Sequence, residues 1–67
     1  DYDRAIADFT KAIELDPKNP DPNHNRGVTY EKMGNKQRAI ADYQQALVLD
    51  PPYEEAKAKL KLLGATP

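Results

Sequence analysis

The chain repeats itself with a period of 34 residues. The segment Arg4–Phe9 returns as Arg38–Tyr43, and both copies run on to an Asp-Pro pair, at positions 16–17 and 50–51. Nine of the sixteen aligned positions from 2 to 17 are identical in the two copies. A fixed period of this length is typical of stacked repeats, in which each unit buries its apolar face against its neighbours. The repeat indicates a scaffold rather than a catalyst.

The first two helices are predicted from apolar spacing and from residues that end helices. Between residues 2 and 15 the apolar side chains recur at helical spacing, at Ala5, Ile6, Phe9, Ala12 and Ile13. Asp16 ends this helix, because a residue before proline is pushed out of the helical region. Asn19 and Pro20 then provide a capping side chain and a first-turn proline for a second helix. This helix is expected to run to about residue 33 and to stop at Gly34.

Two further helices complete an expected all-α chain. Asn35 caps a third helix, which repeats the apolar pattern of the first and ends at Asp50 and Pro51. A fourth is expected over residues 53–63, with one apolar side and one side that suits water. Its apolar side holds Ala56, Leu60 and Leu63, and its polar side holds Lys57, Lys59 and Lys61. A terminal helix of this kind closes a repeat array against solvent.

Composition argues against several classes of function. The 67 residues carry a net charge of −1, which creates no field that favours nucleic acid or an anionic membrane. No apolar run is long enough to span a bilayer, and no targeting signal is visible, so we expect a soluble chain with the cytoplasm as the default compartment. With no cysteine and one histidine, the chain lacks the side chains for a zinc site or a nucleophile and base pair. We expect no enzyme activity, no metal and no cofactor.

The pattern resembles the tetratricopeptide repeat, a 34-residue helix-turn-helix unit. The residues that carry the resemblance are Gly27, Tyr30, Ala39, Tyr43, Ala46 and Pro51. It implies a short α-solenoid of antiparallel helix pairs that acts as a protein-protein interaction module. Residues 1–19 resemble the second half of a repeat, 20–53 a complete repeat and 54–64 a capping helix, all within one domain over residues 1–67.

Two positions depart from the family pattern. Asn23 stands where the pattern has tryptophan, and Arg26 stands where it has leucine. Some repeats combine Asn-Arg-Gly with an aspartate one residue before the next aromatic, as Arg26 and Asp42 do here. The resemblance therefore predicts an ion pair between Arg26 and Asp42, with Asp8 as the alternative partner. For Asn23 we expect a surface exposed to solvent.

The family implies a ligand surface on the second helix, because the first helix of each repeat lines the concave groove. The matching candidates are Asp21, His24, Asn25, Val28, Glu31 and Lys32. The competing interpretation is a solvated helix face without a ligand, on which His24 is simply an exposed histidine. Some repeats hold a peptide's terminal carboxylate with lysines and asparagines of several first helices. Asn25 and Lys32 resemble single elements of that clamp, which one complete first helix cannot supply.

A second hypothesis assigns the activity to the first helix. No partner helix precedes it in the repeat pattern, so its side with Ala5, Phe9 and Ala12 is expected to be open to water. An apolar patch of this kind invites association, and symmetric dimers are a common way to cover one. The sequence thus leaves two alternatives: a protein or peptide partner of unknown identity on the second helix, or a homodimer through the first.

Overall fold

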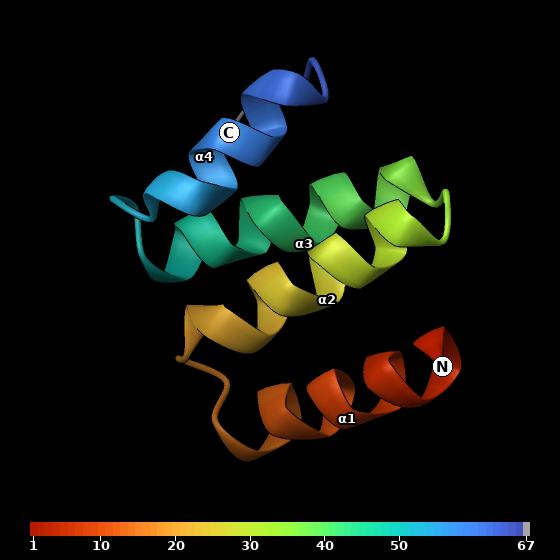
Figure 1. Ribbon diagram of the computed structural model, residues 1–67. Coiled ribbons are helices and arrows are strands. Elements are labelled where there is room, and N and C mark those ends of the chain that lie inside the picture. Colours follow the sequence, from red (N-terminus) through yellow and green to blue (C-terminus); the bar gives the residue numbers. More distant parts are fainter. Residues whose placement is uncertain (67) are drawn as a thin grey trace.

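The chain folds into four helices. The computed structural model describes residues 1–66, which form α1 (Tyr2–Leu15), α2 (Pro20–Lys32), α3 (Lys36–Leu49) and α4 (Glu54–Leu62). Figure 1 shows consecutive helices side by side, with α2 between α1 and α3, and with α4 against α3. The predicted all-α fold with four helices is confirmed, and these residues contain no strand.

Asparagines and glycines set the helix ends. The Asn19 side chain accepts a hydrogen bond from the Asp21 amide, and the Asn35 side chain accepts one from the Arg38 amide. Each bond satisfies a backbone donor that has no partner within its helix. Gly34 follows α2 with φ of 82°, a left-handed conformation that costs glycine little. The chain therefore turns back between α2 and α3 where the sequence predicts it.

The helices form a thin layer rather than a bundle. The principal extents of the molecule are 27 × 26 × 14 Å. Each helix packs mainly on its neighbours in the sequence, in the order α1 on α2, α2 on α3 and α3 on α4. This linear arrangement is that of a stacked helical repeat. Within residues 1–66, no helix has both the length and the apolar character needed to cross a bilayer.

The core lies in the second half of the chain. It consists of residues from α3 and α4 only, namely Ala39, Tyr43, Ala46, Leu47, Ala56 and Leu60. The small side chains in this set let the helices approach closely, and Tyr43 and Leu60 are its largest fully buried members. Gly27 of α2 completes the contact, because a β-carbon at this position would lie 2.8 Å from the Tyr43 ring. Tyr43 therefore fills the space that Gly27 leaves open.

The first helix contributes no buried residue to this core over Tyr2–Leu15. Its predicted apolar side is nevertheless not simply open to water: Ala5, Phe9 and Ala12 are all half-buried. The large apolar residues exposed on α1 are Tyr2 and Leu15, which are 48% and 75% accessible. The side that the sequence predicts to be open to water is therefore partly covered.

Candidate protein-interaction surface

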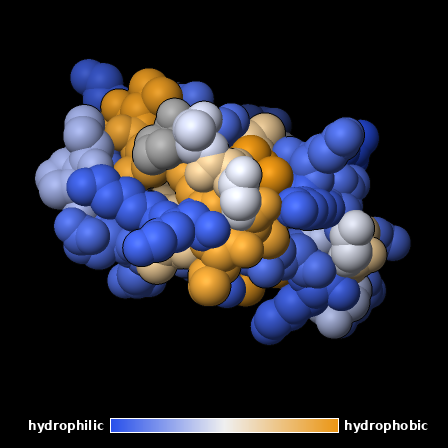
Figure 2. Space-filling model, turned by 90° about the horizontal axis from the view of Figure 1, so that it is seen from above, coloured by the Kyte–Doolittle hydropathy of each residue, from blue (hydrophilic) through white to orange (hydrophobic). Residues whose placement is uncertain are grey.

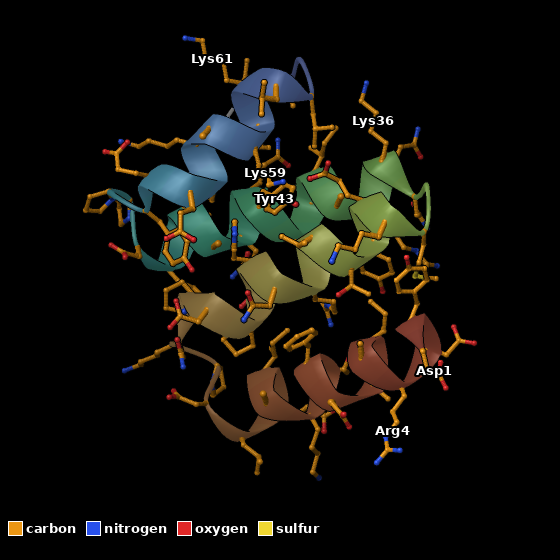
Figure 3. All side chains as sticks on the ribbon, viewed as in Figure 1. Asp1, Arg4, Lys36, Tyr43, Lys59 and Lys61 are labelled. Carbon is orange, nitrogen blue, oxygen red and sulfur yellow. The ribbon has the colours of Figure 1, made fainter. Side chains whose placement is uncertain are left out.

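Half of the six predicted groove residues are held by internal contacts. Asp21 accepts a hydrogen bond of 2.8 Å from the Tyr53 hydroxyl, which lies just before α4. Glu31 accepts one from the Tyr43 hydroxyl, and the same carboxylate oxygen lies 3.6 Å from Lys59 Nζ. These contacts tie α2 to α3 and α4. Figure 3 shows Tyr43 and Lys59 in the middle of the molecule, where the three helices meet.

His24 is buried, so the expectation of an exposed histidine was wrong. Its accessible fraction is 6%, and its ring lies 5.3 Å from the Tyr43 ring and 5.2 Å from the Tyr53 ring, centre to centre. Its Nε2 atom is 3.7 Å from a carboxylate oxygen of Glu55. Burial lowers the pKa of His24, and this outweighs the opposing effect of Glu55. The residue is a neutral part of the contact between α2 and α4.

The two tyrosines of this contact resist ionisation. Burial, and then the hydrogen bond to Asp21, raises the pKa of Tyr53 to about 12. Burial likewise raises the pKa of Tyr43, with the hydrogen bond to Glu31 adding to the effect. A phenolate beside a carboxylate would lose the hydrogen bond and gain a like-charge repulsion. Both hydroxyls therefore act as hydrogen-bond donors at neutral pH.

The other three predicted groove residues remain accessible. Asn25 and Lys32 are exposed, and Val28 is half-buried. The 34-residue period places Lys59 and Leu62 of α4 at the positions that Asn25 and Val28 occupy in α2. Leu62 is 82% accessible, although it is a large apolar residue. These five residues, Asn25, Val28, Lys32, Lys59 and Leu62, are called the α2–α4 surface below.

Sequence analysis missed the contribution of α4 to this surface. It assigned the fourth helix to capping and placed its lysines in water. The signal that identifies Lys59 and Leu62 is the repeat itself, since adding 34 to Asn25 and Val28 gives their positions. The same addition relates Asp21 to Glu55.

The repeat geometry agrees with comparisons to known families. A family model described as TPR repeat matches residues 1–34, and another, described as Tetratricopeptide repeat, matches residues 23–53. The chain belongs to the tetratricopeptide repeat family. Members of this family are in general non-enzymatic scaffolds that mediate protein-protein interactions. No curated protein matches the chain.

The departure from the tetratricopeptide repeat pattern at Arg26 is explained by a side-chain network. Arg26 donates two hydrogen bonds of 2.8 Å to the two carboxylate oxygens of Asp42, so the predicted ion pair is present. A third bond of 3.1 Å reaches the Thr10 hydroxyl of α1, whereas the alternative partner, Asp8, is exposed. The hydrogen bonds to Asp42 raise the pKa of Arg26. One guanidinium therefore joins three consecutive helices.

The departure at Asn23 is not explained in this way. The residue is 3% accessible, so the expected solvent-exposed position was wrong. Its side-chain oxygen is buried without a hydrogen-bond partner among the described residues.

An open apolar pocket lies elsewhere on the tetratricopeptide repeat. It has a volume of about 240 Å³ and is lined by Gln44, Leu47, Val48, Pro51 and Lys57 of α3, α4 and the turn between them. Val48 is 71% accessible. Figure 2 shows apolar side chains gathered in the middle of the face that carries α4, with hydrophilic residues around them. Sequence analysis did not select Val48, whose counterpart in the first copy is Glu14.

Proposed function

We propose that the chain binds a peptide segment of another protein through the α2–α4 surface and carries out no chemistry of its own. The proposal rests on the fact that only half of the predicted groove residues of α2 make contacts with other helices. Asp21, His24 and Glu31 contact the neighbouring helices, which leaves Asn25 and Lys32 exposed to solvent and Val28 half-buried between them. A preorganised surface loses less conformational freedom when a ligand binds.

The side chains of the α2–α4 surface suit an extended or helical peptide segment that carries both apolar and acidic residues. Val28 and Leu62 offer apolar contact from two helices, and Lys32 offers an exposed positive charge, whereas the charge of Lys59 is shared with Glu31 at 3.6 Å. The amide of Asn25 adds a donor and an acceptor that a peptide backbone matches. An acidic residue of the ligand would gain from the lysines, at a rim where such pairs contribute modestly.

Peptide display tests this proposal. A library of random dodecapeptides is selected on the wild-type chain, and the enriched peptides are measured against Asn25→Ala/Lys32→Ala and Val28→Glu by isothermal titration calorimetry. We expect both variants to weaken binding at least tenfold, which corresponds to about 1.4 kcal/mol. Lys36→Ala is the matched control, because Lys36 is an exposed lysine that points away from the molecule (Figure 3).

The result that would overturn the proposal is equally definite. Enriched peptides that bind all three variants as tightly as the wild type, with amide chemical-shift changes outside α2 and α4, would place the binding surface elsewhere.

Self-association through Ala5, Phe9 and Ala12 stays a prediction. It gains support from the lack of any buried residue in Tyr2–Leu15. Light scattering from low micromolar to near-millimolar concentration measures the molar mass of the folded chain. A dimer that Phe9→Asp dissociates while helicity is retained would establish it, and a monomer at every concentration would exclude it.

A further inference from the structure

The contact between α2 and α4 is made by side chains around His24. Each helix packs mainly on its neighbours in the sequence, and α2 and α4 are not such neighbours. Polar side chains nevertheless join α2 to α4 and to the residue before it: His24 to Glu55 at 3.7 Å, Asp21 to Tyr53 at 2.8 Å and Glu31 to Lys59 at 3.6 Å. His24 lies between the other two links along α2. The relative position of α2 and α4 therefore depends on a few side chains.

His24 is enclosed in this contact, whereas its acidic neighbour is not. The imidazole packs against the Tyr43 and Tyr53 rings, which are inclined to it by 46° and 39°. Figure 3 shows Tyr43 and Lys59 where these helices meet. The side chain of His24 is 7% accessible, and that of Glu55 is 78% accessible. The imidazole therefore lies inside the contact and the Glu55 carboxylate at its outer edge.

The surroundings of the ring suit a neutral imidazole but not an imidazolium. The Nδ1 atom of His24 is buried and has no hydrogen-bond partner among residues 1–66. A neutral imidazole carries one N–H group, so Nδ1 can remain an unpaired acceptor, whereas an imidazolium carries N–H groups on both nitrogens. A buried charged donor without an acceptor is costly, because hydrogen bonds of charged groups are the strong ones. The charged ring would therefore have to leave its buried position.

The charges around the ring do not remove this cost. The groups that face His24 are Glu55 and Lys59 of α4 and Asp21 and Glu31 of α2, and α3 faces it with the neutral phenol of Tyr43. The attraction of Glu55 is screened, because its carboxylate is exposed to water. Lys59 repels an imidazolium and is held nearby by Glu31. Burial is the largest effect on the pKa of His24 and lowers it from the usual 6.5.

We propose that His24 is a pH switch for the α2–α4 surface: in mild acid its ring turns out from between Tyr43 and Tyr53 towards Glu55 and water, and α2 separates from the start of α4. The separation shifts Val28 of α2 relative to Leu62 of α4. This inference rests on the proposed function where it concerns binding: a peptide held across both helices is released as pH falls. By reciprocity, a bound peptide opposes protonation of His24.

Proton NMR of the free chain tests the switch without a ligand. At pH 7.5 we expect nuclear Overhauser contacts between the imidazole and the rings of Tyr43 and Tyr53. These contacts should disappear at pH 5.5, with the same midpoint as the titration of the imidazole. His24→Phe is the matched control, because it keeps an aromatic ring between the tyrosines but has no group to titrate, so its Tyr53 signals should not change. Contacts that persist in the protonated wild type would overturn the proposal, whether or not the variant folds.

Isothermal titration calorimetry tests the effect on binding, with the dodecapeptides selected on the wild-type chain at pH 7.5. We expect the wild type to bind at least about fivefold more weakly at pH 5.5, and His24→Phe to change by less than about twofold. The same peptides are used with both proteins, so their own carboxylates affect both equally. An equal loss of affinity in both proteins, or none in the wild type, would overturn the proposal. Peptides that bind outside α2 and α4 at pH 7.5 would contradict the proposed function alone, because the ring contacts of the free chain still decide the switch.

Discussion

At the residue scale, the guanidinium of Arg26 links three helices through its hydrogen bonds to Asp42 and Thr10. Its side chain is 22% accessible, and that of its partner Asp42 is 8% accessible. Removal of the arginine would leave a buried carboxylate without a counter-charge, which is the costly way to break such a pair. We expect Arg26→Ala to lower the free energy of unfolding by about 2–3 kcal/mol, as measured by urea denaturation followed by circular dichroism.

A double variant provides the control for this prediction. Arg26→Leu/Asp42→Leu removes both charges and restores the apolar character that the family pattern has at position 26. We expect it to recover most of the loss, because two apolar side chains need no partner. A double variant as unstable as Arg26→Ala would show that the cost comes from lost packing rather than from the unpaired carboxylate.

Also at the residue scale, His24 makes the free energy of unfolding depend on pH in the mildly acidic range. Its pKa in the folded chain is lowered from the usual 6.5, mainly by burial; Lys59 lowers it further, and Glu55, Asp21 and Glu31 oppose the effect. The unfolded chain therefore takes up the proton first as pH falls. The contribution of His24 is fully present above pH 6.5 and declines below it, towards the folded pKa.

Two measurements check this pH dependence. A proton NMR titration of the single imidazole should give a pKa below 6.5. Urea denaturation at pH 7.5 and 5.5 should show a larger loss of stability for the wild type than for His24→Gln, which has no imidazole to titrate. An imidazole pKa at or above the usual value would contradict the buried, neutral assignment.

Two errors of the sequence analysis concern polar residues that the structure buries. The expected ion pair of Arg26 with Asp42 joins α2 to α3 and is present, and it was predicted from the family resemblance rather than from a local signal. His24 and Asn23 look like surface residues in the chain, because each is polar and no partner lies within one turn. His24 is buried by Tyr43, Tyr53 and Glu55, which lie at least 19 positions away along the chain. The 34-residue period does not indicate which polar residues are buried by contacts between helices.

At the scale of the helix, α4 has two sides with opposite roles. Leu60 is fully buried in the core, and Leu62, two residues later, is 82% accessible. Leu60→Ala removes buried methyl groups and leaves a cavity, so we expect a loss of about 3 kcal/mol in the free energy of unfolding. Leu62→Ala is the matched control on the same helix, and its effect should remain within about 0.5 kcal/mol.

Amide hydrogen exchange in the Leu60→Ala variant distinguishes two ways in which α4 can be held against the other helices. If apolar packing on α3 dominates, Leu60→Ala should also release the hydrogen bond between Tyr53 and Asp21, seen as faster exchange of the amides of Glu54–Leu62. If the polar contacts to α2 suffice, α4 should stay protected in this variant. We expect release, because hydrogen bonds and ion pairs near solvent contribute little by themselves.

Helix positions were more predictable than contacts between helices. The ends of α1 and α3 follow from aspartate before proline, and the end of α2 follows from Gly34, all of which act within one turn. The fourth helix was expected over residues 53–63 and spans Glu54–Leu62. The role of this helix was harder to predict. Lysines on a short helix usually indicate a face exposed to water, and nothing in the sequence shows that Lys59 pairs with Glu31.

At the scale of the whole molecule, stability is distributed unevenly along the layer of helices. The core residues belong to α3 and α4, α2 contributes Gly27 and His24 to the same region, and Tyr2–Leu15 contributes no buried residue. In a linear array each helix is stabilised mainly by its neighbours, so the end with the least burial opens first. We expect amide hydrogen exchange to be fastest in α1, intermediate in α4 and slowest in α2 and α3.

Native-state exchange followed by NMR checks this order, and a change at one end provides its control. Arg26 links α1 to the core through Thr10, so Thr10→Val should speed exchange in α1 and leave α3 unchanged. Equal protection of α1 and α3 in the free chain would contradict this order, because it would require α1 to be stabilised by something other than its contacts with α2.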